Sequence, residues 1–547
     1  MRKYLRFPLL VLCALSWSCI GNTIPYPVVT LQILNVEGKG FTFSAADIDS
    51  ENRVVKLRLD EQTDPSRVEI EKISVTEGAG SSSPLSGVFD LRTPYYITLS
   101  LYQEYEWTIV AEQHIERYFD VESQIGSATI DAAQRTATAY VSAGTDLSAI
   151  KVTRLKLGPA DITTMTPPIE ELTSFTEEVE GGGGLRYVHI AYHDIKERWA
   201  LYVIPTDTKI RFTQLDAWSG VIWAYAEGNS DAELGFRYRT AGAEEWSEVA
   251  KEALTVSGGA FHTCITGLAP ETEYELLAYS GEDETEIATV ATGPMTLLPN
   301  GGFEEWATIN NIVCPYLEES TAFWGTGNTG ARVGGVIPTN STTDIRPGSS
   351  GHYAAKLESK AVLGSILAAG NLFTGRFCAV RNGTNGVVGF GQPFEQRPTA
   401  LRGWFKYNQG ELNIVKTQPP GLDLQKGDPD NGMIYIALGT WTPEKYGESG
   451  GEMFGTPETP IAIDTRNTGS FFDPSGPDVI AYGEMPLTST VAQWQEFTIP
   501  LKYTATDRKP THIIVVCTAS RWGDYFTGSS SSVLWVDDFE LIYDRLE

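Results

Sequence analysis

The chain has 547 residues, of which 70 are acidic and 41 are basic, so its formal net charge at pH 7 is −29. An acidic chain repels phosphate backbones and anionic lipid surfaces, so we exclude nucleic acid and anionic membrane surfaces as partners and expect a neutral ligand. Its length, its 53 glycines and its 29 prolines predict three to five domains with many turns.

Residues 1–18 have the pattern of a secretory leader. Three basic residues precede a short apolar run at positions 8–15, which is much shorter than a membrane span. The sequence SWSC at 16–19 resembles a loose lipobox, so we expect a lipoprotein signal peptide, cleaved before Cys19, with lipid attached to that residue. The mature protein would then be an outer membrane lipoprotein on the cell surface or the periplasmic face. Ordinary secretion, with cleavage nearby, is the alternative.

Four further cysteines follow, at positions 264, 314, 378 and 517. They have no CxxC spacing and no histidine pair beside them, so a zinc site is not expected. In an oxidising compartment they would form one or two disulfides or stay as buried thiols, and the sequence does not decide between these outcomes.

Short runs of alternating apolar and polar residues, broken by Gly, Asp, Asn and Pro, predict an all-β protein with little helix. Residues 48–70 align without a gap on residues 130–152, and Trp107 and Trp199 fall at matching strand positions further on. We interpret the two segments as copies of one immunoglobulin-like sandwich, with the first repeat at 25–115 and the second at 116–206. The identities recur as Ile48, Asp49, Arg53, Thr63, Asp64 and Ser66 in the first copy and Ile130, Asp131, Arg135, Thr145, Asp146 and Ser148 in the second.

A third unit is expected at 207–296. Its sequence "TGLAPETEYELLAY", residues 266–279, resembles the fibronectin type III signature, in which Tyr274 would close a corner of the sandwich. Trp223 is expected to fill the core of this unit. Such modules mostly act as spacers, so we predict no ligand site in residues 25–296.

From about residue 297 glycines and aromatic residues become more frequent and longer loops separate the strands. The motifs "NGGFEEW" (300–306), "FGQPFEQRPTALRGWFKY" (390–407) and "RWGDYFTGSSSSVLWVDDFELIYD" (521–544) closely resemble the putative carbohydrate metabolism domain, PCMD, of exported Bacteroidetes lipoproteins. The resemblance covers 297–547 and implies a jelly-roll β-sandwich similar to galactose-binding-like and carbohydrate-binding modules. It implies no proven reaction.

The resemblance also implies a structural calcium ion. In jelly-roll carbohydrate-binding modules such an ion often lies where the first strand meets the last, and Glu304, Asp538 and Asp537 would supply oxygen atoms here, together with main-chain carbonyls. Calcium takes six to eight oxygen ligands. Alternation along a strand would send Glu304 and Glu305 to opposite faces, so only one of them could reach the ion. Simple solvation of these carboxylates is the alternative.

Carbohydrate sites need exposed aromatic rings beside polar groups, because sugars present both hydroxyls and apolar C–H faces. Loops at 520–532 and 323–330 offer this combination, and a Gly-rich insertion at 440–455 is a third candidate. Gly523 and Gly528 are expected to allow unusual backbone angles. Aromatic residues that merely close the ends of the sandwich are the alternative. The predicted carbohydrate-binding residues are Trp324, Asn328, Arg521, Trp522, Asp524 and Tyr525.

No GxSxG, HExxH or Gly-rich phosphate loop is present, so a serine-hydrolase or zinc mechanism is not expected. A glycosidase mechanism with two carboxylates stays open, and the sequence identifies no catalytic residue. We therefore predict a monomeric, lipid-anchored protein that binds a polysaccharide or oligosaccharide through its C-terminal jelly roll. The alternatives are a glycoside hydrolase or lyase and a non-catalytic structural or adhesion protein.

Overall fold

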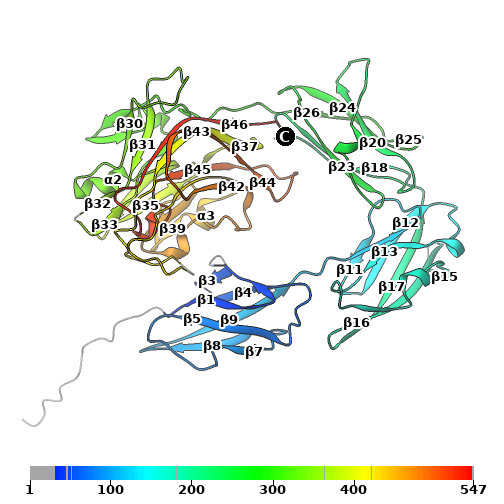
Figure 1. Cartoon of the computed structure of the whole chain (residues 1–547). Coiled ribbons are helices and arrows are strands. Elements are labelled where there is room, and N and C mark those ends of the chain that lie inside the picture. The colour runs from blue at the N-terminus through cyan, green and yellow to red at the C-terminus, as the bar shows by residue number, and fades with distance from the viewer. Residues whose placement is uncertain are drawn as a thin grey trace, which may run out of the picture. The chain divides into compact units, whose positions relative to one another are not determined.

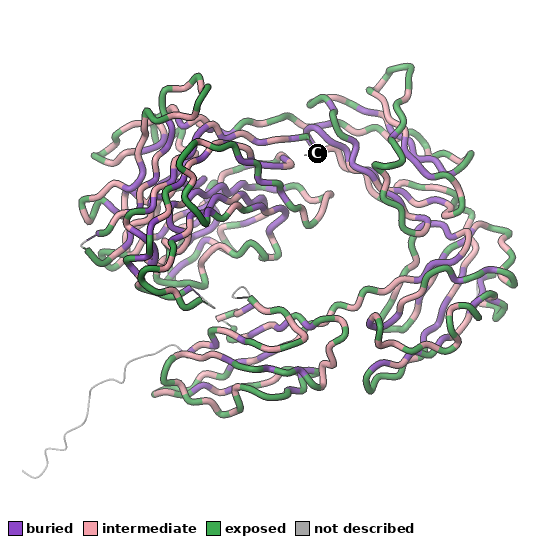
Figure 2. Tube along the Cα trace, in the orientation of Figure 1, coloured by how far each residue is buried: buried purple, intermediate pink, exposed green. Residues whose placement is uncertain are grey.

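The computed structural model describes residues 31–44, 47–50, 52–179, 182–362, 364–419 and 422–544. This part of the chain is all-β, with mostly antiparallel sheets and a few helical turns (Figure 1). Buried residues run along the paired strands, and exposed residues follow the connecting loops (Figure 2). No helix in the described ranges is long and apolar enough to span a membrane. The predicted leader and Cys19 lie outside the described residues.

The first sandwich packs two sheets around Trp107, which is 1% exposed. Its strands are β1 (Ile33–Lys39), β2 (Phe41–Thr42), β3 (Ile48–Asp49), β4 (Val54–Leu59), β5 (Val68–Val75), β6 (Gly80–Ser81), β7 (Gly87–Phe89), β8 (Tyr95–Ser100) and β9 (Glu104–Gln113). One sheet has the order β1-β5-β7, and the other has the order β2-β4-β9-β8-β6 with β3 paired to β4.

The second sandwich repeats this arrangement around the buried Trp199. It contains β10 (Tyr118–Val121), β11 (Thr129–Asp131), β12 (Thr136–Ser142), η2 (Leu147–Ala149), β13 (Val152–Lys156), β14 (Thr164–Thr166), η3 (Ile169–Glu171), β15 (Glu177–Val179), β16 (Gly183–Tyr192) and β17 (Ile195–Thr206). The order β11-β12-β17-β16-β14 matches β3-β4-β9-β8-β6 of the first sandwich. Arg53 and Arg135, which the sequence alignment equates, both have positive φ angles, 54° and 56°. The two segments therefore share a backbone as well as a sequence pattern.

The third sandwich encloses a core built around Phe236 and Phe261. Its elements are β18 (Arg211–Ala217), β19 (Ile222–Glu227), β20 (Leu234–Thr240), β21 (Ser247–Glu248), η4 (Lys251–Ala253), β22 (Thr255–Ser257), β23 (Ala260–Ile265), β24 (Glu273–Ser280), β25 (Asp283–Glu284) and β26 (Ala288–Ala291). The Tyr274 hydroxyl accepts a hydrogen bond from the Ala269 N–H at 2.9 Å, which closes the tyrosine corner.

The expected role of Trp223 in this core is wrong. Ile222 and Ala224 point into the core, so alternation along β19 turns Trp223 to the other face of the sheet. There it packs with Trp218, whose ring centre lies 4.3 Å from that of Tyr503 in the C-terminal domain. The buried Arg397 guanidinium donates to the carbonyls of Ala217 and Thr506 beside this contact.

The C-terminal domain is a sandwich of a nine-stranded and a five-stranded sheet. The nine-stranded sheet has the order β41-β35-β34-β45-β38-β42-β44, with β29 on β34 and β36 on β45; the five-stranded sheet has the order β30-β31-β46-β37-β43. The nine strands are β29 (Trp324–Gly325), β34 (Asn371–Arg381), β35 (Asn385–Phe390), β36 (Gln392–Pro393), β38 (Gly432–Gly439), β41 (Ile461–Asp464), β42 (Val479–Leu487), β44 (Lys502–Tyr503) and β45 (His512–Thr518). The five strands are β30 (Thr339–Thr342), β31 (Ala354–Glu358), β37 (Ala400–Asn408), β43 (Val491–Pro500) and β46 (Val533–Ile542).

Short hairpins and helical turns complete this domain. They are β27 (Ala307–Ile309), β28 (Ile312–Cys314), η5 (Glu319–Thr321), α2 (Asn328–Ala331), η6 (Arg332–Gly334), β32 (Lys360–Val362), β33 (Ile366–Ala368), α3 (Pro443–Tyr446), β39 (Glu448–Ser449), β40 (Glu452–Met453), η7 (Thr468–Ser470) and η8 (Gly523–Tyr525).

The nine-stranded sheet is covered on both faces. Ile434 and Ile436 of β38 face the five-stranded sheet in the main core, whereas Tyr435 and Ala437 face a second apolar cluster on the outward side. A strand buried on both faces reads as a continuous apolar run, which is the pattern of β38 and β45. The outward cluster is the floor of the site described below.

The stretch 300–306 is a turn followed by an extended segment, not the first strand of the domain as expected. Asn300 and Phe303 in this stretch adopt positive φ angles of 48° and 54°. Cys314, Cys378 and Cys517 are free thiols, and burial raises the pKa of the Cys378 and Cys517 thiols.

Candidate functional site

A pocket of about 370 Å³ opens on the outward face of the nine-stranded sheet. This volume lies within the range of roughly 300–1,000 Å³ that is usual for small-molecule sites. Its floor contains a cross-strand row in which Phe373, Val516, Tyr435 and Glu484 are paired in turn on β34, β45, β38 and β42. Directly paired residues point to the same face of a sheet, so all four side chains face the pocket.

One wall of the pocket is the turn after β45, which carries Arg521, Trp522, Asp524 and Tyr525. Backbone hydrogen bonds from Tyr525 and Thr527 to the Trp522 carbonyl close this turn tightly. The rings of Trp522 and Tyr525 meet edge to face, with 6.1 Å between their centres.

The glycines of this turn serve a different purpose from the one expected. Phe526, with φ of 53°, is the residue of the turn that adopts the left-handed conformation. A Cβ on Gly523 would lie 2.5 Å from the Cβ of Ala369, and one on Gly528 would lie 2.6 Å from Leu367. Gly523 and Gly528 therefore allow the turn to approach the neighbouring loop closely.

Asp430 anchors both ends of this turn from beneath. One of its carboxylate oxygens accepts hydrogen bonds from the Ser520 hydroxyl at 2.6 Å, the Ser529 N–H at 2.8 Å and the Ser532 hydroxyl at 2.8 Å. The other oxygen is buried and has no hydrogen-bond partner. Burial outweighs the hydrogen bonds from the serines and raises the pKa of Asp430 to about 6. Asp430 thus positions the turn without lining the pocket.

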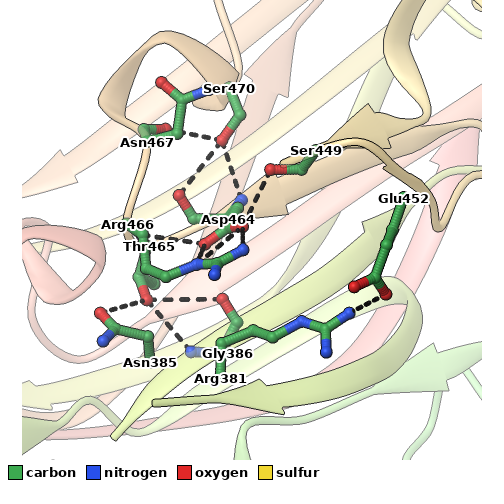
Figure 3. A network of polar contacts seen from close by, with 10 residues as sticks. All are labelled: Arg381, Asn385, Gly386, Ser449, Glu452, Asp464, Thr465, Arg466, Asn467 and Ser470. Atoms are coloured by element: carbon green, nitrogen blue, oxygen red, sulfur yellow. Dashed lines mark hydrogen bonds and ion pairs between the residues drawn. The ribbon is translucent and has the colours of Figure 1, made fainter.

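The opposite wall contains Phe471 and Phe472, which follow a polar network shown in Figure 3. Asp464 binds the Arg466 guanidinium through both of its oxygens and accepts a hydrogen bond from the Ser449 hydroxyl at 2.8 Å (Figure 3). Burial opposes ionisation of Asp464, but the hydrogen bonds from Arg466 and Ser449 outweigh it and lower the pKa of the carboxyl.

Aromatic contacts and a hydrogen bond hold this wall against the floor and the other wall of the pocket. The Phe472 ring stacks on Tyr435 with 5.7 Å between centres, and the Phe471 ring meets Tyr525 edge to face at 5.0 Å. Thr465, which follows Asp464, accepts a hydrogen bond from the Gly386 N–H of β35 (Figure 3). The two walls therefore contact each other through aromatic rings.

Charged groups gather at the β42 side of the pocket. The Tyr482 hydroxyl donates to the Glu484 carboxylate at 2.7 Å, and the Arg521 guanidinium lies 3.9 Å from the same oxygen. Asp524 is exposed at the pocket, and desolvation by the surrounding protein raises the pKa of its carboxyl. Desolvation, with the nearby Asp524 charge, raises the pKa of Tyr525 to about 12.

Four of the six predicted carbohydrate-binding residues line this one pocket: Arg521, Trp522, Asp524 and Tyr525. The structure contradicts a surface role for the other two. Trp324 is 0% exposed in the main core, where its Nε1–H donates to the Pro299 carbonyl at 2.8 Å. Asn328 is also 0% exposed.

Asn328 instead joins two loops. Its amide nitrogen donates to the carbonyls of Val313 and Thr339, and its amide oxygen accepts from the Thr339 N–H at 2.9 Å. The third candidate loop, 440–455, places Trp441 in the outward apolar cluster at 3% exposure, so its indole is structural as well.

Sequence reasoning missed the residues that strands present to the pocket. Tyr435, Tyr482 and Glu484 lie on β38 and β42, whereas the predicted binding residues all come from predicted loops. The run "VIAYGEMPL" of β42 gives one usable signal, because Glu484 is the charged residue within a strand that is otherwise uncharged. Asp430 had no distinguishing signal, because its serine partners are about a hundred residues away.

The predicted calcium ligands, Glu304 and Asp538, already have protein partners. The Glu304 carboxylate accepts hydrogen bonds from the N–H groups of His352 at 2.8 Å and Tyr353 at 3.2 Å, and Asp538 forms an ion pair with Arg346 at 2.5 Å. The described residues include no group of three or more His, Cys, Asp or Glu side chains that could hold a metal ion. Arg346 supplies positive charge beside Asp538, and the calcium ion stays a prediction that a calcium titration tests.

Residues 302–542 match the family model described as "Putative carbohydrate metabolism domain". None of the curated proteins compared with the chain matches it. A solved putative glycoside hydrolase from Bacteroides thetaiotaomicron aligns over 96% of this chain and 99% of its own, with 16% identity and a TM-score of 0.30.

Two further solved structures are similar over parts of the chain. A putative glycoside hydrolase from Bacteroides vulgatus covers 45% of this chain and 98% of its own, at 21% identity and a TM-score of 0.32. A surface glycan-binding protein from Prevotella bryantii covers 66% and 82%, at 9% identity and a TM-score of 0.19. At such scores these likenesses carry no inference about function. The match to the putative carbohydrate metabolism domain family covers residues 302–542 of the C-terminal domain.

Proposed function

We propose that the pocket on the nine-stranded sheet binds one end or one short segment of a glycan. The observation that carries this proposal is the meeting of Trp522 and Tyr525 with Glu484, Arg521 and Asp524 around one open pocket. The family match supports it, because the domain that contains the pocket matches a carbohydrate-related family.

The chemistry of these groups suits a sugar. The apolar C–H faces of a pyranose pack on aromatic rings, and its hydroxyls bind carboxylates and guanidinium groups through charge-assisted hydrogen bonds. A formal net charge of −29 favours neutral glycans over acidic ones, because the field of the chain repels anions.

Calorimetric titration of the full chain with the glycans selected on an array tests the proposal. The Trp522→Ala variant should bind at least tenfold more weakly, since it removes a ring from the pocket wall. The Trp494→Ala variant is the matched control, because Trp494 lies on β43 of the other sheet. Absence of binding to every glycan would favour the structural or adhesion alternative.

A second candidate, glycoside hydrolysis, is favoured by the presence of two carboxylates, Glu484 and Asp524, in the same pocket. Retaining and inverting glycosidases both use two carboxyl groups, one of them an acid with a raised pKa. Asp524 has that character and would protonate the leaving oxygen, while Glu484 would act as nucleophile or base.

Release of reducing ends from a bound oligosaccharide is the corresponding assay. Asp524→Asn and Glu484→Gln should each lower the rate by a factor of a hundred or more while binding persists. A product with an unsaturated sugar at its non-reducing end, formed together with a new reducing end, would indicate a lyase. A rate unchanged in both variants would exclude this pair as the catalytic groups.

We also propose that the protein is anchored to the cell envelope by lipid on Cys19. The lipobox-like sequence at 16–19 supports this proposal. Metabolic labelling with an alkynyl fatty acid should mark the wild-type protein and leave Cys19→Ala unlabelled. Equal labelling of both proteins would refute the anchor.

A further inference from the structure

The two ends of the pocket differ in chemistry. Among the residues that line it, the charged side chains are Glu484, Arg521 and Asp524, and they come from β42 and the turn after β45. The other end, at β34 and β35, is lined by Phe373, Phe377, Val388 and Phe390. The sheet order β35-β34-β45-β38-β42 places Glu484 at the opposite edge of the floor from these apolar residues, and the Arg521 guanidinium lies 3.9 Å from the Glu484 carboxylate.

The cross-strand row gives the distance between the charged end and the apolar end of the pocket. From Phe373 on β34 to Glu484 on β42 the row crosses three interstrand spacings, or roughly 14 Å. Phe377 and Val388, which pair directly, extend the apolar end onto β35. A single sugar ring at the charged end would leave the apolar end unfilled.

The polar atoms near the apolar end are largely engaged by the protein itself. The Asn371 side-chain oxygen accepts from the Gly327 N–H at 2.7 Å, and the Thr465 hydroxyl accepts from the Gly386 N–H at 3.1 Å. A second sugar placed there would find few partners for its hydroxyls, and each hydroxyl buried without a partner costs free energy. An aromatic group would meet Phe373 and Phe390, whose rings lie 5.0 Å apart and tilted, with no hydroxyl to satisfy.

We propose that the pocket binds a glycoside that carries an aryl group. The sugar lies against Glu484 and Arg521, and the aryl group lies against Phe373, Phe377 and Val388. This inference rests on the proposed glycan-binding function and names the class of glycan.

The test compares matched ligands on the full chain by calorimetry. The probes are the methyl and 4-nitrophenyl α- and β-glycosides of glucose, galactose, mannose and xylose, together with free 4-nitrophenol. We expect at least one 4-nitrophenyl glycoside to bind ten times or more tightly than its methyl partner and than 4-nitrophenol.

Variants of the apolar end test the same preference. The ratio of the affinity for the 4-nitrophenyl glycoside to that for the methyl glycoside should fall at least fivefold in Phe377→Ala and in Val388→Thr. The second substitution is nearly isosteric, so it provides a folded variant if Phe377→Ala unfolds. Arg521→Gln should weaken both members of a pair equally, and Trp494→Ala should change neither.

Each failure has its own meaning. Equal affinity for methyl and aryl glycosides would overturn the inference and leave glycan binding intact. Equal affinity for 4-nitrophenol and its glycosides would also overturn it, since the sugar would then contribute nothing. Failure of every glycoside, on a protein that binds array glycans, would overturn the inference alone, and failure of both sets would overturn the proposed function with it.

Discussion

Two segments of the C-terminal domain share a short sequence pattern but have opposite roles. "FWGTGNTG" at 323–330 and "RWGDYFTG" at 521–528 each carry Trp-Gly at their second and third positions and end in Thr-Gly. Trp324 belongs to β29, and the main core encloses it together with Phe303 and Phe539. Trp522 follows the end of β45 and lines the outward pocket. The face of the sheet at which each segment arrives, rather than its composition, decides whether the indole stabilises the fold or is available to a ligand.

The largest expected effect that tests this contrast is the loss of Trp324. Trp324→Ala should lower the free energy of unfolding of the C-terminal domain by about 3–5 kcal/mol, because it leaves a cavity in the main core and removes a buried hydrogen bond. Chemical denaturation monitored by circular dichroism measures this loss. A loss below about 1 kcal/mol would mean that Trp324 is not enclosed.

Asn328 provides a polar version of the same test. Asn328→Ala should cost roughly 2–3 kcal/mol, since it leaves the buried carbonyls of Val313 and Thr339 and the Thr339 N–H without their partner. Thermal and chemical unfolding check this value. If the variant instead kept its stability and lost glycan affinity, Asn328 would belong to the site after all.

Asp430 links stability to pH through the turn that carries Trp522. Its pKa in the folded protein, about 6, lies above the ordinary value of 3.8 for an aspartic acid, so the folded state binds the proton more tightly than the unfolded state. This carboxyl therefore stabilises the fold below its unfolded pKa and costs stability as pH rises through about 6. Between pH 4 and pH 7 its contribution should change by about 2 kcal/mol.

Asp430→Asn isolates this contribution. The isosteric amide keeps an oxygen for the three donors, so the variant should lack the 2 kcal/mol step while the pocket stays intact. Unfolding curves of both proteins at pH 4, 5, 6 and 7 give the comparison, in which other carboxyls cancel. If the free energies of unfolding of both proteins changed equally with pH, Asp430 would not have a raised pKa in the folded state.

The smallest expected effect on stability belongs to Trp522. Trp522→Ala should change the free energy of unfolding by less than about 1 kcal/mol, because the indole is only partly buried on an outer turn. Comparison with Trp324→Ala in the same denaturation experiment sharpens the contrast between the two segments. A loss as large as that of Trp324→Ala would place Trp522 in a core.

Much of the fold could be predicted from sequence because its signals are local. Alternating runs predicted the strands, and the ungapped alignment predicted the repeat that Arg53 and Arg135 share even in backbone angle. The turn 521–525 of the candidate site was also predicted, because its aromatic and charged residues are consecutive.

The rest of the site depends on pairing between distant strands. Phe373, Tyr435, Glu484 and Val516 come together only through the order β34-β45-β38-β42, which no single segment encodes. Tyr435 lies in a strand with apolar residues on both faces, so the periodicity of the sequence could not predict that its side chain faces a pocket. The same limit applies to Trp324, since a tryptophan beside glycines is equally compatible with a core and with a binding loop.

A crystal structure of the full chain with its tightest array glycan tests the central claim most directly. The account predicts sugar density in the outward pocket, packed on Trp522 or Tyr525 and within hydrogen-bond distance of Glu484 or Arg521. Trp404, Trp494 and Trp535 lie on the five-stranded sheet, away from this pocket. Sugar bound at that sheet, with the pocket unchanged from the free protein, would contradict the account.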